Sequence, residues 1–154
     1  MCVWAILTVV MKMKDSKDLL SSILKTTQMG QIGIRSVLNA RIQPELRREL
    51  EAQLKEYDAI EQEAHSIAAS RSWELPELNP AIKGMTNMMT RARLSSGNVS
   101  SKAAAMMING NTMGMIKSLK NIHAFSGDDA QVAGLSQRLL DCETANIRKV
   151  QGFV

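Results

Sequence analysis

Polar side chains that could carry chemistry recur near the middle of every long apolar-periodic segment of this 154-residue chain. Buried polar groups cost about 1–3 kcal/mol each unless they are paired. Their recurrence at one level predicts a shared polar centre, which is either an internal hydrogen-bond network or a ligand site. The residues that we assign to this polar centre are Gln28, Gln31, Tyr57, Glu61, Gln62, His65, Asn109, Asn111, Glu143 and Asn146.

Methionine is the second unusual feature, because seven of the eleven methionines lie between positions 85 and 115. Flexible thioethers fill irregular gaps in a core that is poor in aromatic residues, and they also form adaptable binding surfaces. Thioether sulfur is in addition a ligand for Cu(I). We expect core packing here, with a partner-binding surface and copper binding as alternatives. This Met cluster comprises Met85, Met88, Met89, Met106, Met107, Met113 and Met115.

Other chemistries lack their motifs in this sequence. There is no CxxC pair, no glycine-rich phosphate loop and no Ser-His-Asp or Cys-His pattern of a nucleophilic enzyme. The net charge of +4 is modest, and its basic residues alternate with acidic ones rather than forming a stripe with aromatics. We therefore expect no enzyme activity, no cofactor and no nucleic-acid partner. Two cysteines, Cys2 and Cys142, are too few for a disulfide scaffold and favour a reducing cytoplasm.

The elements that must position these residues are helices. Apolar residues recur at a period of 3.6 over residues 16–39, 44–71, 101–124 and 126–151, and a shorter helix is expected at 80–94. Ser126 and Asp129 form a capping-box pattern before the last helix. Gly110 and Gly114 are four residues apart, which predicts close helix packing along that face. The connection between the second and third long helices is long enough to cross the whole length of a bundle.

These features resemble the ferritin-like superfamily, whose di-iron members take one Glu from each of two helices and a Glu-x-x-His from each of the other two. The matching positions here are Gln28 or Gln31, then Gln62-x-x-His65, then Asn109 or Asn111, and finally Glu143-x-x-Asn146. Glu61 is the nearest carboxylate to His65. Neutral amides cannot balance the charge of two irons, so the resemblance implies the fold without a complete di-iron site. A degenerate metal site is the alternative.

Two segments carry a narrower resemblance. Residues 44–50 (PELRREL), 61–67 and Trp73 resemble a segment of spore coat protein F and its ferritin-like relatives. Residues 105–116 (AMMINGNTMGMI), with the ending 143–149 (ETANIRK), resemble a helix found in uncharacterised proteins of Firmicutes. The resemblance implies a helical protein without known chemistry, located in the cytoplasm or associated with the spore.

The sequence therefore predicts an all-α fold. It is an antiparallel four-helix bundle of ferritin-like type with a short extra helix in the long second connection. Residues 14–154 form this single domain. Residues 1–13 are an apolar leader that is shorter than the roughly 20 residues of a membrane span, and we expect a mis-annotated start, with a membrane tether or an extra packing segment as alternatives. The expected role is structural or protein-interacting, without a membrane partner, and the region 85–115 is a candidate homodimer surface.

Overall fold

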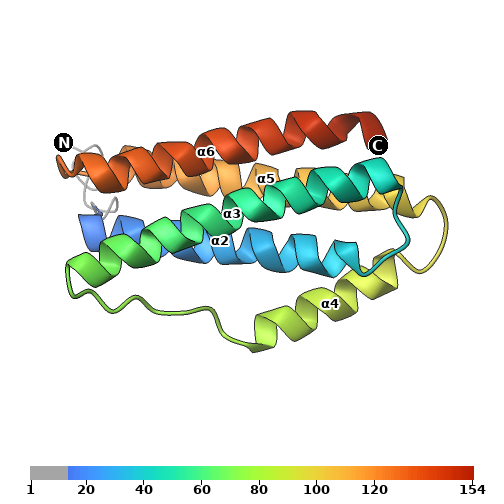
Figure 1. Cartoon of the computed structure of the whole chain (residues 1–154), viewed down its shortest axis with the longest axis horizontal. Coiled ribbons are helices and arrows are strands. Elements are labelled where there is room, and N and C mark those ends of the chain that lie inside the picture. Colours follow the sequence, from blue (N-terminus) through green and yellow to red (C-terminus); the bar gives the residue numbers. More distant parts are fainter. Residues whose placement is uncertain (1–13) are drawn as a thin grey trace, which may run out of the picture.

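The computed structural model describes residues 14–154, and this part of the chain is all-helical, as expected (Figure 1). The leader predicted at residues 1–13 lies outside the described residues. No strand occurs between residues 14 and 154. The helices are α2 (Ser16–Leu38), α3 (Pro44–Ser70), α4 (Ala81–Arg93), α5 (Val99–Ala124) and α6 (Ala130–Val150), followed by the 3-10 turn η1 (Gln151–Phe153).

Three of these helices begin at an acidic or amide side chain that accepts a hydrogen bond from a free backbone amide of the first turn. Asp15 accepts from the amide of Asp18 at 2.8 Å, and Asn98 accepts from that of Ser101 at 3.1 Å. Asp129 caps α6 by accepting from Val132 at 3.3 Å. The last helix therefore begins four residues later than the predicted Ser126. The backbone of Ser126 instead pairs with the carbonyl of Lys14 at 3.3 Å, which holds it outside the helix.

The four long helices lie side by side. α2 packs against α3 and α5, and α6 packs against α5 and α3. Figure 1 shows that α2 and α6 run in one direction while α3 and α5 run in the other. Each of the four contributes fully buried apolar side chains to one core, which is what stabilises helices of this kind. The largest of these side chains include Leu20, Leu24, Ile34, Leu46, Leu50, Ile60, Leu135 and Leu139.

The connection between α3 and α5 spans the length of the molecule, because α3 ends at one end and α5 begins at the other (Figure 1). Within this connection α4 packs against α2, and Thr90 is its one buried residue. The hydroxyl of Ser36 on α2 donates a hydrogen bond to that of Thr90. The short helix is thus held against α2 with little buried apolar surface.

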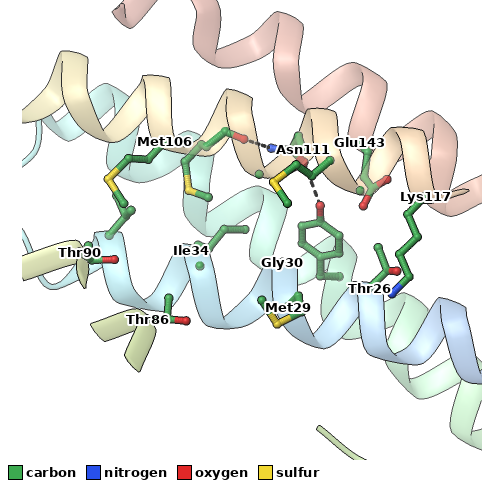
Figure 2. A pocket seen from close by; sticks show the side chains of 17 residues that line it. Thr26, Met29, Gly30, Ile34, Thr86, Thr90, Met106, Asn111, Lys117 and Glu143 are labelled. Atoms are coloured by element: carbon green, nitrogen blue, oxygen red, sulfur yellow. Dashed lines mark hydrogen bonds between the residues drawn. The ribbon is translucent and has the colours of Figure 1, made fainter. Parts of the chain in front are cut away.

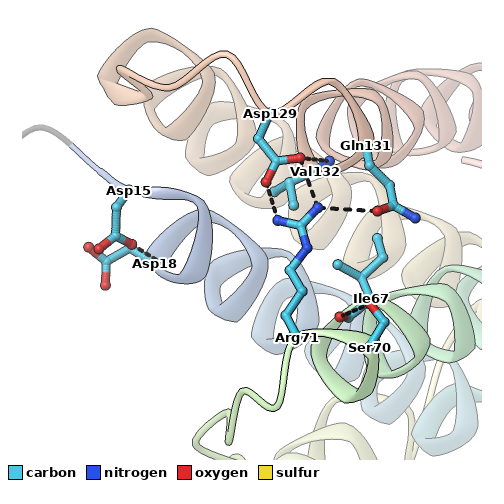
Figure 3. A network of polar contacts seen from close by, with 8 residues as sticks. All are labelled: Asp15, Asp18, Ile67, Ser70, Arg71, Asp129, Gln131 and Val132. Carbon is cyan, nitrogen blue, oxygen red and sulfur yellow. Dashed lines mark hydrogen bonds and ion pairs between the residues drawn. The ribbon is translucent and has the colours of Figure 1, made fainter.

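A polar contact joins the end of α3 to the start of α6 (Figure 3). The guanidinium of Arg71 makes a two-point contact with the Asp129 carboxylate and also donates to Gln131 at 3.2 Å. Its carbon lies 4.9 Å above the centre of the Trp73 ring, within the range of a cation–π contact. Asp129 therefore serves two elements, as the cap of α6 and as the partner of Arg71.

Among the described helices none is both long and apolar enough to cross a membrane.

Candidate functional site

Four of the residues predicted for the polar centre meet in the interior. The Tyr57 hydroxyl on α3 donates to the side-chain oxygen of Asn111 on α5 at 2.9 Å. The Asn146 amide on α6 donates to the same oxygen at 3.4 Å, and the Asn111 amide donates to the carbonyl of Met107 at 2.8 Å. Glu143, one turn before Asn146 on α6, is also buried. Three helices thus contribute to one buried polar cluster.

The other predicted residues do not join this cluster. The Gln31 amide donates to Asp58 at 2.8 Å, between α2 and α3, and Gln28 is half-buried. Gln62, His65 and Asn109 are exposed, and Glu61 is half-buried. The buried face of α3 passes through Tyr57, Ile60, Ala64 and Ile67, so positions 62 and 65 point away from the core by the helical period.

A metal centre of His, Cys, Asp or Glu ligands is not assembled in the described part of the chain. Within residues 14–154 no group of three or more His, Cys, Asp or Glu side chains lies close enough together to hold a metal ion. In particular, Glu61, His65 and Glu143 do not form such a group. The degenerate di-iron alternative requires these three side chains to share one coordination shell with metal–ligand distances of about 2 Å.

A groove of about 370 Å³ lies between α2, α4 and α5, and sequence analysis did not predict it. This volume falls within the roughly 300–1,000 Å³ of small-molecule sites, and its mainly apolar lining with a few polar groups is also typical of them. Figure 2 shows the groove with Thr90 and Met106 toward one end and Lys117 and Glu143 toward the other. Its lining comprises Thr26, Met29, Gly30, Gly33, Ile34, Val37, Tyr57, Thr86, Thr90, Met106, Met107, Gly110, Asn111, Met113, Gly114, Lys117 and Glu143.

Glycines make this groove. A Cβ at Gly110 would meet no atom within 4 Å, so this position borders empty space rather than a closely packed helix, and the prediction of close packing is wrong there. A Cβ at Gly114 would overlap the Glu143 carboxyl, and one at Gly30 would lie 2.7 Å from the Tyr57 ring. The two glycines therefore admit one side chain from α6 and one from α3 to the floor of the groove. The sequence signal that could have indicated the groove is the presence of these glycines inside helices with apolar faces.

Glu143 is the most unusual titratable group of the groove. The residue is only 2% exposed, and the Ser118 hydroxyl donates to its carboxyl over a long 3.3 Å. Burial raises the pKa of Glu143 from its ordinary value of 4.5 to about 8, against the smaller opposing effects of Ser118 and Lys117. Glu143 is therefore mainly protonated at neutral pH. A protonated carboxyl has a hydrogen to donate.

The neighbouring groups are suited to binding rather than to nucleophilic chemistry. Burial raises the pKa of the Cys142 thiol to about 11, and burial together with Glu143 raises the pKa of Tyr57 as well. Neither group supplies an anion near neutral pH, and a thiolate is the reactive form of cysteine. At the end of the groove, partial burial and the charges of Lys14 and Lys25 lower the pKa of Lys117.

The Met cluster divides between two environments. Met107 is buried and Met106 and Met115 are half-buried, which agrees with core packing. Met85, Met88 and Met89 on α4 and Met113 on α5 are instead 50–72% exposed, so core packing is wrong for them. For the three methionines of α4 the reason is that this helix buries little of its own surface. Met29, which does not belong to the Met cluster, is also exposed, and it lines the groove together with Met113.

No protein-family model, curated protein or solved structure matches this chain.

Proposed function

We propose that this chain is a non-enzymatic binding protein that holds an apolar ligand in the groove between α2, α4 and α5. The observation that carries the proposal is a 370 Å³ groove with a mainly apolar lining and methionines at its opening. Met29 and Met113 line it and remain 42% and 72% exposed. Exposed apolar side chains around a cavity mark binding sites, and methionine adapts to ligands of different shape. We propose this ligand-binding role in place of the structural or protein-interaction role that we expected from the sequence.

The proposed scaffold is a four-helix bundle of ferritin-like type, formed by α2, α3, α5 and α6. The running directions of the four helices and the long connection that contains α4 support this assignment. Bundle proteins of that connectivity build their sites from side chains that face inward on adjacent helices. In this chain the inward polar groups Tyr57, Asn111 and Asn146 bond to one another. The space for a ligand lies beside this cluster rather than within it.

Filling the groove tests the proposal. Gly110→Leu places a large side chain where a Cβ meets no atom within 4 Å, and Gly134→Leu makes the same change on α6, outside the groove. Both replace a helical glycine by a good helix former, so neither should lower the stability of its helix. The probe in this binding experiment is an uncharged dye whose fluorescence increases in apolar surroundings.

We expect the wild-type protein and Gly134→Leu to bind the dye with equal affinity and Gly110→Leu to bind it at least tenfold more weakly. Equal affinity in all three proteins, or no dye binding by the folded wild-type protein, would contradict the proposal. Far-ultraviolet circular dichroism of the three proteins establishes that each variant is folded.

A further inference from the structure

The groove has two chemically different ends. Figure 2 shows Thr26 and Lys117 at one end and Met106 at the other. Val37 also lines the groove and lies toward the Met106 end, because it follows Ile34 along α2. Thr26 and Val37 are eleven positions apart on one helix, and at 1.5 Å per residue the groove is about 16 Å long. Its shape therefore fits an elongated ligand with two unlike ends.

The end at Thr26 offers hydrogen-bond donors to a ligand. The Thr26 hydroxyl is buried, with the residue 7% exposed, and has no hydrogen-bond partner among residues 14–154. An unpaired buried hydroxyl costs free energy that a ligand atom would recover. The Glu143 carboxyl, beside it in the lining, receives only the long bond from Ser118.

The same end carries excess positive charge. Lys117 is exposed at the groove and lies in the field of Lys14 and Lys25. Within residues 14–154 none of these three lysines belongs to an ion pair with an Asp or Glu. The acid that acts on Lys117 is Glu143, which its burial keeps mainly protonated below about pH 8. Tyr57 and Cys142, which also face Glu143, stay neutral at that pH.

The remainder of the groove is mainly apolar. Met29, Ile34, Val37, Met106 and Met107 line it together with the neutral polar residues Tyr57, Thr86, Thr90 and Asn111, and the described lining holds no charged side chain between Gly114 and the far end. Flexible methionines accommodate an alkyl chain with little strain. With C–C bonds of about 1.5 Å, an extended chain of about twelve carbons matches the length of the groove.

We propose that the ligand of the groove is an alkyl carboxylate. Its anionic head group lies at Lys117 and Thr26, and its chain extends between α2 and α5 toward Val37 and Met106. The head group thereby gains an ammonium partner and satisfies the unpaired Thr26 hydroxyl. A cationic amphiphile would instead meet the Lys117 ammonium, which is itself repelled by Lys14 and Lys25. This inference rests on the proposed function, because it names the ligand class of the same groove.

Three twelve-carbon probes that differ in the head group separate the two proposals. Dodecanoate, dodecanol and dodecylamine are titrated into the full chain at pH 7 by calorimetry, each below its aggregation limit. Lys117→Gln removes the ammonium of the groove. Lys120→Gln is the matched control, because Lys120 is an exposed lysine of the same helix that does not line the groove.

We expect the wild-type protein and Lys120→Gln to bind dodecanoate at least about tenfold more tightly than dodecanol, as one charge-assisted contact would give. Lys117→Gln should lose this preference and keep its affinity for dodecanol. Equal binding of dodecanoate and dodecanol, or a preference for dodecylamine, would overturn the ligand class and leave the groove as an apolar site. Failure of all three probes to bind would overturn the proposed function as well.

Discussion

The Glu143 carboxyl on α6 lies against the Cα atom of Gly114 on α5, in the space that a Cβ at position 114 would occupy. Without this glycine, the α5 backbone could not approach a carboxyl that points past it into the groove. A residue of α6, which packs against α5, therefore reaches a groove that is otherwise built by α2, α4 and α5 with Tyr57 of α3. This relationship connects the buried polar cluster to the groove, and it makes several properties of the protein testable.

Gly114→Ala should displace the Glu143 carboxyl and destabilise the protein. Alanine in place of a helical glycine ordinarily gains about 0.5–1 kcal/mol, but here overpacking of a buried site costs about 1–3 kcal/mol. Gly110→Ala, one turn earlier and next to empty space, should show only the gain. Urea unfolding measures both effects. The penalty of Gly114→Ala should disappear when Glu143 is also replaced by alanine, and a penalty that persists in that background would refute the contact.

Stability should fall as the pH rises from about 5 to about 8. The pKa of Glu143 is about 8 in the folded protein against an ordinary value of 4.5, so the unfolded chain ionises first and the folded state loses relative stability through this interval. The slope approaches about 1.4 kcal/mol per pH unit for one such group. Glu143→Gln, which is isosteric and neutral, should remove this part of the pH dependence. Unfolding free energies at pH 5, 7 and 9 measure it, and parallel curves for the two proteins would be inconsistent with a protonated Glu143.

Asp129→Asn should lower the melting temperature more than Asp15→Asn. Asparagine caps helices about as well as aspartate, so both variants keep an acceptor for the first turn. Asp129 also pairs with Arg71, and this guanidinium holds the pKa of the Asp129 carboxyl well below its usual range. Asp15, in contrast, is paired with the backbone amide of Asp18 (Figure 3).

This contribution of Asp129 is present above its ordinary pKa of 3.8 and is lost as the pH falls below that value. The difference in melting temperature between the two variants should therefore be large at pH 6 and shrink in more acidic solution. Equal melting temperatures at pH 6 would count against the ion pair.

Tyr57→Phe should cost about 1–2 kcal/mol, because it leaves the buried oxygen of Asn111 with the single long bond from Asn146. The ring contact with Gly30 is retained in this variant. Combining Tyr57→Phe with Asn111→Leu forms a double-mutant cycle that isolates the pair. We expect the cost of Tyr57→Phe to fall to a few tenths of a kcal/mol in the Asn111→Leu background. Additive costs would show that the hydrogen bond contributes little.

The helices could be predicted from the sequence because their apolar period and their boundary residues are local signals. Asp15 and Pro44 stand at the expected helix starts. Ser126 misled the prediction because a backbone contact with Lys14, distant in the sequence, holds it outside α6. Local patterns do not record such contacts.

The polar centre could be predicted only in part. Position along the helix axis is visible in the sequence, and hydrogen bonds join three of the residues that it placed at one level, Tyr57, Asn111 and Asn146. Rotation about the axis is set by packing, and it turned Gln62 and His65 toward solvent. The groove was missed because it depends on glycines of two helices that are far apart in the sequence. Gly110 borders empty space, and Gly30 and Gly114 admit Tyr57 and Glu143 to the floor of the groove.

The central claim is that the groove binds an apolar ligand, and the methionine methyl groups report on it directly. The protein is labelled with ¹³C at the methionine methyl groups and titrated with dodecanol by NMR. Met29, Met106, Met107 and Met113 line the groove, whereas Met85, Met88 and Met89 lie on α4 outside it. We expect the four groove signals to shift together and saturate, while the three α4 signals stay in place. Saturating shifts confined to the α4 methionines, or no shift of the groove methionines, would contradict the claim.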